Sequence, residues 1–244
     1  MVVRRGDYGT DGPGVVISYG AAASAFLVAT ALLAWWNWPW PASACLLLGL
    51  ACAAATVSFL WTTWRGKFAV WTELLDELRL RGDEALLDVG CGRGAVLMSA
   101  AKRLPRGRAV GVDIWSTADQ SGNCEAALLR NAAAEGVADH VELSTSDMRA
   151  LPFSDRSFDV VTSSLAIHNV QETTGRESAL SEILRVLKPG GVALIADVFY
   201  AREYARWFAA RPEAKVEVRP LGWRVWFFGP LLPTHLVKVT RSVS

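Results

Sequence analysis

The longest stretch of this chain without a charged side chain runs from residue 12 to residue 64, and it constrains the fold most strongly. It contains no Asp, Glu, Lys or Arg, whereas charged residues recur throughout the sequence from Arg65 onward. A helix that faces water carries a polar face, and a helix that is apolar all round lies in a large core or in a membrane. The sequence therefore predicts two parts made for different surroundings, an anchor at residues 1–64 and a domain at residues 65–244.

Two apolar runs of spanning length make up the uncharged stretch. Residues 15–36 and residues 42–63 each contain 22 residues, and at about 1.5 Å rise per residue a helix of that length crosses a hydrocarbon core of about 30 Å. The turn between them reads Asn37-Trp38-Pro39-Trp40-Pro41, and two prolines this close end a helix. We therefore expect a hairpin of two transmembrane helices, at about residues 15–36 and 42–63.

Tryptophan and basic residues predict the orientation of this hairpin. Tryptophans cluster at the turn and at the end of the second run, as they do at the headgroup level of a bilayer. Arg4 and Arg5 precede the first run, Arg65 and Lys67 follow the second, and the turn carries no charge. The positive-inside rule then places both termini and the larger domain in the cytosol. The expected location is the cell membrane, crossed twice.

Three other interpretations of the uncharged stretch remain open. The first run is a cleaved signal peptide if Ala42-Ser43-Ala44 serves as a small-residue cleavage site. Both runs are core helices if the protein is wholly soluble. A re-entrant hairpin is the third alternative, because alanine-rich runs are only moderately hydrophobic.

Charge and cysteine content limit the possible partners. The net charge is +1 with mixed signs along the charged part, and no basic block of the kind that follows a phosphate backbone is present. The four cysteines lack the spacing of metal ligands. We therefore expect neither nucleic acid nor a metal ion as a partner.

Short apolar runs alternate with helical patterns after the second apolar run. This alternation is typical of an α/β fold, a parallel sheet covered by helices on both faces. Two further strand-like runs near the end predict an antiparallel hairpin added to the sheet. The expected strands are residues 85–89, 109–114, 140–143, 158–163, 192–198, 215–219 and 236–240, and the expected helices are residues 68–78, 95–104, 125–135, 176–187 and 202–210.

The turn after the first expected strand carries the chemistry. It reads Asp88-Val89-Gly90-Cys91-Gly92-Arg93-Gly94. Glycines let a backbone turn sharply and approach a ligand closely, and the helix that follows offers free N–H groups. The next expected strand ends near Asp113, whose carboxylate can accept both hydroxyls of a ribose. A glycine-rich turn alone also occurs in dinucleotide-binding folds.

Residues 88–94 resemble the first motif of class I S-adenosylmethionine-dependent methyltransferases. The similarity is greatest to the small-molecule branch that includes ubiquinone and menaquinone biosynthesis methyltransferases. Further motifs agree in order: Ser146-Asp147-Met148 after the third strand, residues 157–161 leading into the fourth, and residues 182–191 before the fifth. The resemblance covers about residues 72–240. It implies the class I Rossmann-like, seven-stranded sheet with flanking helices, preceded here by a transmembrane helical hairpin.

The resemblance also implies S-adenosyl-L-methionine as the cofactor and assigns residues to its parts. Backbone atoms of the glycine turn would contact the methionine part, and Asp88 would orient its ammonium group. Asp113 would bind the ribose, and Ile114 and Trp115 would lie against the adenine, although Trp115 is equally interpreted as a core or surface aromatic. The full set of expected cofactor-binding residues is Asp88, Gly90, Cys91, Gly92, Gly94, Asp113, Ile114, Trp115, Asp147, Met148 and Ser164.

Methyl transfer needs alignment of the acceptor, and it needs a base only if the acceptor arrives protonated. His168, in the loop after the fourth expected strand, is the candidate catalytic residue; equally, it could simply hydrogen-bond that loop. The polar insert at residues 115–124 could fold over the cofactor or line the acceptor pocket. We expect methylation of a small, apolar or amphipathic acceptor reached from the lipid bilayer. The alternatives are an enzyme for a soluble small molecule, tethered for localisation, and a membrane protein that binds the cofactor without catalysis.

Overall fold

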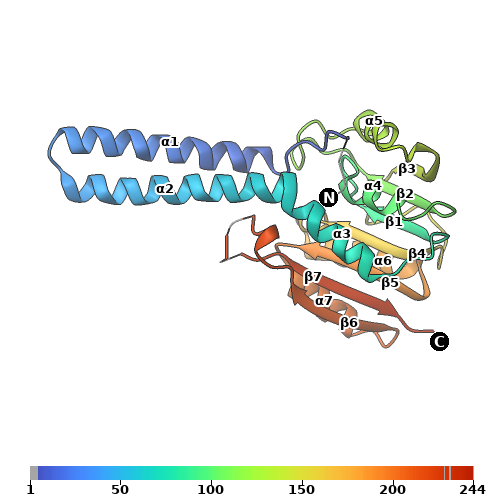
Figure 1. Ribbon diagram of the computed structural model, residues 1–244. Helices are drawn as coiled ribbons and strands as arrows, with labels where there is room; N and C mark the ends of the chain where they lie inside the picture. Colours follow the sequence, from blue (N-terminus) through green and yellow to red (C-terminus); the bar gives the residue numbers. More distant parts are fainter. Residues whose placement is uncertain (1–4, 228, 231, 244) are drawn as a thin grey trace.

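The computed structural model describes residues 5–227, 229–230 and 232–243. A long helical hairpin projects from an α/β part that holds the sheet (Figure 1). Arg4, on which part of the predicted orientation rests, lies outside the described residues.

The hairpin consists of α1 (Pro13–Trp35) and α2 (Pro39–Trp61), which run side by side in opposite directions (Figure 1). The predicted start of the second helix at residue 42 is wrong, because Pro39 lies in the first turn of α2. Proline is favoured there, since its missing N–H has no partner within the helix in any case and its φ suits the helix. The reversal is made by Asn37, whose φ of 56° is left-handed.

Most of the hairpin surface is apolar and exposed. The exposed fractions of Val28, Leu47 and Val57 are 60%, 69% and 66%. The helices meet at small residues: a Cβ placed on Gly49 would lie 3.2 Å from the Leu27 side chain. Close approach at small residues is how helices associate where no water drives them together. Both helices are long and apolar enough to cross a membrane, judged by length and composition.

The hairpin continues directly into the α/β part. After α2, one π-turn, η1 (Thr62–Gly66), leads into α3 (Lys67–Glu77) without a break. The short helix η4 (Trp223–Val225) packs against this junction. The Trp61 and Trp223 rings stack with centroids 6.4 Å apart, and a Cβ on Gly66 would lie 1.6 Å from the Arg224 carbonyl oxygen. The junction is therefore closely packed.

The seven strands form one sheet in the order β3-β2-β1-β4-β5-β7-β6. β7 is antiparallel to both of its neighbours, and the other pairs are parallel. This confirms the predicted sheet with a final antiparallel hairpin. The strands are β1 (Ala85–Val89), β2 (Arg108–Asp113), β3 (Val141–Thr145), β4 (Phe158–Ser164), β5 (Leu187–Asp197), β6 (Ala214–Pro220) and β7 (His235–Arg241).

Helices cover both faces of the sheet. One buried cluster joins Leu86 to leucines of α3, α4 (Ala95–Ala101) and α5 (Glu125–Glu135). A second cluster joins Leu87 to side chains of α6 (Thr173–Val186) and α7 (Ala201–Ala209). Neighbouring strand residues point to opposite faces, so consecutive leucines supply both cores. Full burial of such a side chain contributes about 1.5–3 kcal/mol.

Residues 5–12, before α1, lie across the α/β part and are called the strap. The Tyr8 hydroxyl donates to Glu135 at 2.9 Å, and the Asp7 N–H donates to the Asn131 side chain at 2.8 Å. Asp11 forms a β-bridge with Gln120. Both ends of the hairpin are therefore attached to the α/β part, one through the strap and the other through α3.

Candidate functional site

A cavity of about 550 Å³ lies at the carboxyl edge of the parallel strands. Ligands of α/β sheets bind at this edge, and the volume lies within the usual range for small-molecule sites, about 300–1,000 Å³. Nine of the residues expected to hold the cofactor line it: Asp88, Gly90, Cys91, Gly92, Asp113, Ile114, Asp147, Met148 and Ser164.

The glycine turn after β1 forms one wall of the cavity. Gly90, Gly92 and Gly94 have φ values of 71°, 53° and 84°, a region that favours glycine. A Cβ on Gly90 would lie 2.2 Å from the Ala166 Cβ, so the turn touches the loop after β4. Gly94 caps α4 and does not itself line the cavity. Burial raises the pKa of the Cys91 thiol well above its ordinary value, which leaves a neutral side chain there.

Asp113, the last residue of β2, is held from two sides. Its Oδ2 accepts from the Gly92 N–H at 2.7 Å. Its Oδ1 accepts from the Trp115 N–H at 2.6 Å and from the Asn123 side chain at 3.2 Å. This carboxylate therefore joins the glycine turn to the polar insert, with its orientation fixed at the cavity wall.

Asp88 is almost completely buried beside the glycine turn, with 1% of its surface exposed. Its Oδ1 accepts from the Thr162 hydroxyl at 2.8 Å. Burial raises the pKa of Asp88 to about 7, and the nearby Asp113 charge adds to the rise. A cationic group bound beside it would favour the carboxylate form and lower that pKa.

Asp88 makes ligand binding depend on pH if it meets the ammonium group of the ligand. Only the ionised carboxylate attracts that group, so we expect the affinity for S-adenosylhomocysteine to rise about tenfold between pH 6 and pH 8. Binding at pH 7 should release protons, which calorimetry detects by repeating the titration in buffers of different ionisation enthalpy. The Asp88→Asn variant cannot titrate and should release none. Equal proton release by that variant would contradict this role.

Three further residues reach the cavity, two from the loop after β3 and one from the end of β4. The Asp147 carboxylate is 2.6 Å from the Arg149 guanidinium, and that hydrogen-bonded pair lowers the pKa of Asp147. A Cβ on Gly90 would lie 3.5 Å from the Met148 methyl group, which places Met148 against the glycine turn. The Ser164 hydroxyl accepts from the Trp71 indole N–H of α3 at 2.9 Å. The cavity therefore has α3 as a neighbour on this side.

Trp115 and His168 do not line the cavity. The Trp115 indole donates to the Thr145 hydroxyl at 2.8 Å, so it lies along the end of β3. His168 belongs to the short helix η3 (Ile167–Asn169), with its Nδ1 2.6 Å from an oxygen of the buried Asp197. The backbone N–H of His168 donates to the other oxygen of Asp197 at 3.3 Å. The adjacent residues Ala166 and Asn169 do line the cavity.

Two cavity residues that the sequence prediction missed come from the ends of the hairpin. Lys67, the first residue of α3, donates to the two oxygens of Asp11 in the strap at 2.8 and 2.7 Å. The sequence held one indication of this contact, because Asp11 and Lys67 carry opposite charges and lie on either side of the uncharged stretch. The polar insert also lines the cavity, through Ser116, Asp119, Gln120 and Asn123.

The comparisons with known proteins agree with this geometry. Residues 87–195 match the family model described as a methyltransferase domain. A ubiquinone/menaquinone biosynthesis C-methyltransferase, UbiE of Roseobacter denitrificans, is 35% identical over 133 residues, which cover 54% of this chain and 50% of that protein. The chain spans about half the length of the curated relatives it matches.

Solved structures share the fold at low identity. The [4+2]-cyclase SpnF matches with a TM-score of 0.58 and 19% identity, over 71% of this chain and 81% of that one. A geranyl diphosphate methyltransferase in complex with GPP and sinefungin matches with a TM-score of 0.55 and 20% identity, over 71% and 77%. A cyclase and a methyltransferase on one fold show that function must be argued from the site.

Proposed function

We propose that this chain, which carries a class I S-adenosylmethionine-dependent methyltransferase domain, methylates a small apolar or amphipathic acceptor that reaches the site from a lipid bilayer. One observation carries the proposal. The exposed apolar hairpin (Figure 1) joins the α/β part at Lys67, and Lys67 itself lines the cavity. A hairpin seated in a bilayer would therefore hold the cavity close to molecules dissolved there.

The cavity suits the cofactor in shape and charge. The glycine turn brings its backbone to the cavity wall at Gly90 and Gly92, which have left-handed φ values. We assign the ribose hydroxyls to Asp113, the methionine ammonium group to Asp88, and the adenine to Ile114 and Met148. A positively charged sulfonium is also favoured by a cavity wall rich in carboxylates.

The bound cofactor supplies an electrophilic methyl group and its own leaving group. The chain then has to align the acceptor and exclude water. We assign alignment to the loop after β4, where Asn169 and Ser164 line the cavity. We assign any proton removal that the acceptor needs to His168, because Ala166 and Asn169 on either side of it in the same loop line the cavity.

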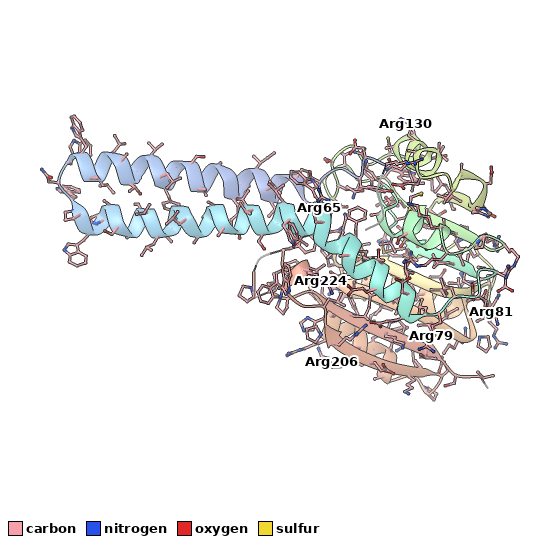
Figure 2. The ribbon with its side chains drawn as sticks, in the orientation of Figure 1. Arg65, Arg79, Arg81, Arg130, Arg206 and Arg224 are labelled. Carbon is pink, nitrogen blue, oxygen red and sulfur yellow. The ribbon has the colours of Figure 1, made fainter. Side chains whose placement is uncertain are left out.

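Charge placement supports insertion of the hairpin with both ends in the cytosol. Figure 2 shows the labelled Arg65 and Arg224 at the end of the hairpin that joins the α/β part. Basic residues are retained on the cytosolic side of membranes. Cleavage of the first run as a signal peptide would also remove the strap, including Asp11 of the cavity wall. We therefore propose that the hairpin is retained as a two-pass anchor.

Cysteine labelling in intact cells tests this orientation. Cys124 is exposed on the α/β part, so a membrane-impermeant maleimide should label it only after the cells are lysed. An Asn37→Cys variant places a thiol at the hairpin turn and should be labelled in intact cells. Labelling of Cys124 before lysis, or protection of the turn, would contradict the proposed topology.

Surface dilution tests whether the acceptor is dissolved in the bilayer. The full chain is reconstituted into vesicles that contain lipid extract from its native membranes, together with increasing amounts of inert phospholipid. At constant bulk concentration of extract and protein, the rate of methyl transfer should fall with the mole fraction of extract in the bilayer. If the rate did not change with this dilution, the acceptor would be in the aqueous phase. That result would favour a tethered enzyme for a soluble substrate.

A further inference from the structure

The ion pair between Lys67 and Asp11 is unusual in its burial and its position. The exposed fractions of the two side chains are 7% and 16%. The pair joins the residue just before the uncharged stretch to the first residue of α3, so it ties the two ends of the hairpin together. Both side chains line the cavity. Burying two charges is costly, which favours a role for the pair beyond stability.

A short chain of hydrogen bonds links this pair to the glycine turn. Asp11 Oδ1 accepts from the Gln120 amide at 2.9 Å, and Gln120 Oε1 accepts from the Arg93 N–H at 2.7 Å. A Cβ on Gly92 would lie 2.5 Å from the same Gln120 oxygen. The Gln120 side chain therefore connects the ion pair to the glycine turn, whose backbone is expected to contact the methionine part of the cofactor.

The charges around the cavity limit what can bind a carboxylate there. Asp88, Asp113, Asp119 and Glu172 line it along with Asp11. Among the described lining residues, the cations are Lys67 and Arg149, and Arg149 is held by Asp147 through both of its carboxylate oxygens. A lysine ammonium group has three N–H donors, and its described hydrogen bonds go to the two oxygens of Asp11. The third donor makes no hydrogen bond within the described residues, although the Phe68 ring centroid lies 5.6 Å from Nζ, and a ligand can accept from it.

We propose that Lys67 binds the carboxylate of the cofactor's methionine part and that Asp11 holds the Lys67 ammonium group in place, so that the two ends of the apolar hairpin complete the cofactor site. This proposal rests on the proposed function, and it names the residues that would bind the amino-acid end of the cofactor. Asp11 is a positioning residue, because it acts through Lys67. The membrane anchor is then part of the binding site as well as a tether.

The affinities for two ligands distinguish a direct contact of Lys67 with the cofactor from a purely structural role of Lys67. S-Adenosylhomocysteine carries the amino-acid carboxylate, and 5′-methylthioadenosine lacks the whole amino-acid part. Binding of each to the full chain in detergent is measured by calorimetry. Lys67→Met should weaken S-adenosylhomocysteine binding about 10- to 100-fold, the usual worth of a hydrogen bond to a charged group. The affinity for 5′-methylthioadenosine should change less than about twofold.

A double variant and a control variant distinguish loss of the Lys67 contact from a general effect on folding. Lys67→Met leaves the Asp11 carboxylate without its partner, so a Lys67→Gln, Asp11→Asn double variant replaces the pair with neutral groups of similar size; it should show the same ligand selectivity. Lys188→Met removes a lysine of β5 that is paired with Asp159 outside the cavity lining, and both affinities should be unchanged. Equal losses for the two ligands, or no loss, would overturn the inference. Failure of the unaltered chain to bind either ligand would instead contradict the proposed cofactor.

Discussion

Replacing Asp113 with alanine is expected to weaken S-adenosylhomocysteine binding about 100-fold or more. Two hydroxyl–carboxylate bonds to a ribose are each worth about 1.5–3 kcal/mol, so their joint loss reaches this size. The same substitution frees the Gly92 and Trp115 N–H groups that Asp113 now holds. The glycine turn and the insert would then lose their common anchor. The measurement is a calorimetric titration of the purified full chain.

Two further variants define the cause of that loss. Asp113→Asn keeps the shape but replaces one acceptor with a donor, so we expect an affinity between those of the unaltered chain and the alanine variant. Asp155→Ala removes an exposed carboxylate that pairs with Arg185 away from the cavity, and binding should be unchanged. Unaltered affinity of a folded Asp113→Ala variant would contradict the assignment of the ribose to this residue.

Gly66→Ala is expected to destabilise the junction between the hairpin and the α/β part. Gly66 has a helical φ of −61°, so alanine fits the local backbone and would by itself favour the helix by about 1 kcal/mol. Its Cβ, however, would lie 1.6 Å from the Arg224 carbonyl oxygen, a backbone atom that cannot rotate away. We expect a net loss of about 1–3 kcal/mol, typical of overpacking, seen as a lower Tm in detergent.

Gly20→Ala is the matched control for this prediction. Gly20 lies within α1, and a Cβ there meets nothing within 4 Å. The substitution should leave Tm unchanged or raise it slightly, because only the helix propensity changes. If Gly66→Ala behaved in the same way, the junction would not be the close contact described above.

Features that depend on local pattern were predictable from the sequence. The strand β1 and the helix α5 have the expected bounds, because a short apolar run that ends in a glycine turn and a capped helical repeat each specify their own structure. The seven-stranded sheet with its final antiparallel hairpin follows from the motif series, since alternation of strands and helices leaves few possible topologies. The grouping of Asp88, Asp113 and Asp147 at one edge follows from the same rule, because parallel strands end together.

Features that depend on contacts between distant residues were not predictable. Lys67 and Asp11 meet only because the hairpin returns the chain to its starting point, 56 residues later. The strap has no apolar periodicity that would reveal its place on α5. Trp115 has a φ of 62°, and its indole donates to Thr145, 30 residues further along, so it lies outside the cavity lining. The position of His168 depends on Asp197, which lies 29 residues further along, at the end of another strand.

The central claim is methyl transfer from the cofactor to a molecule of the bilayer, and one labelling experiment tests it directly. Native membranes that contain the full chain are incubated with methyl-labelled S-adenosylmethionine and then extracted with organic solvent. We predict label in the extracted lipid fraction, and we predict that it disappears with the Asp113→Ala variant. Label confined to the aqueous fraction, or equal labelling of the lipids by the variant, would contradict the claim.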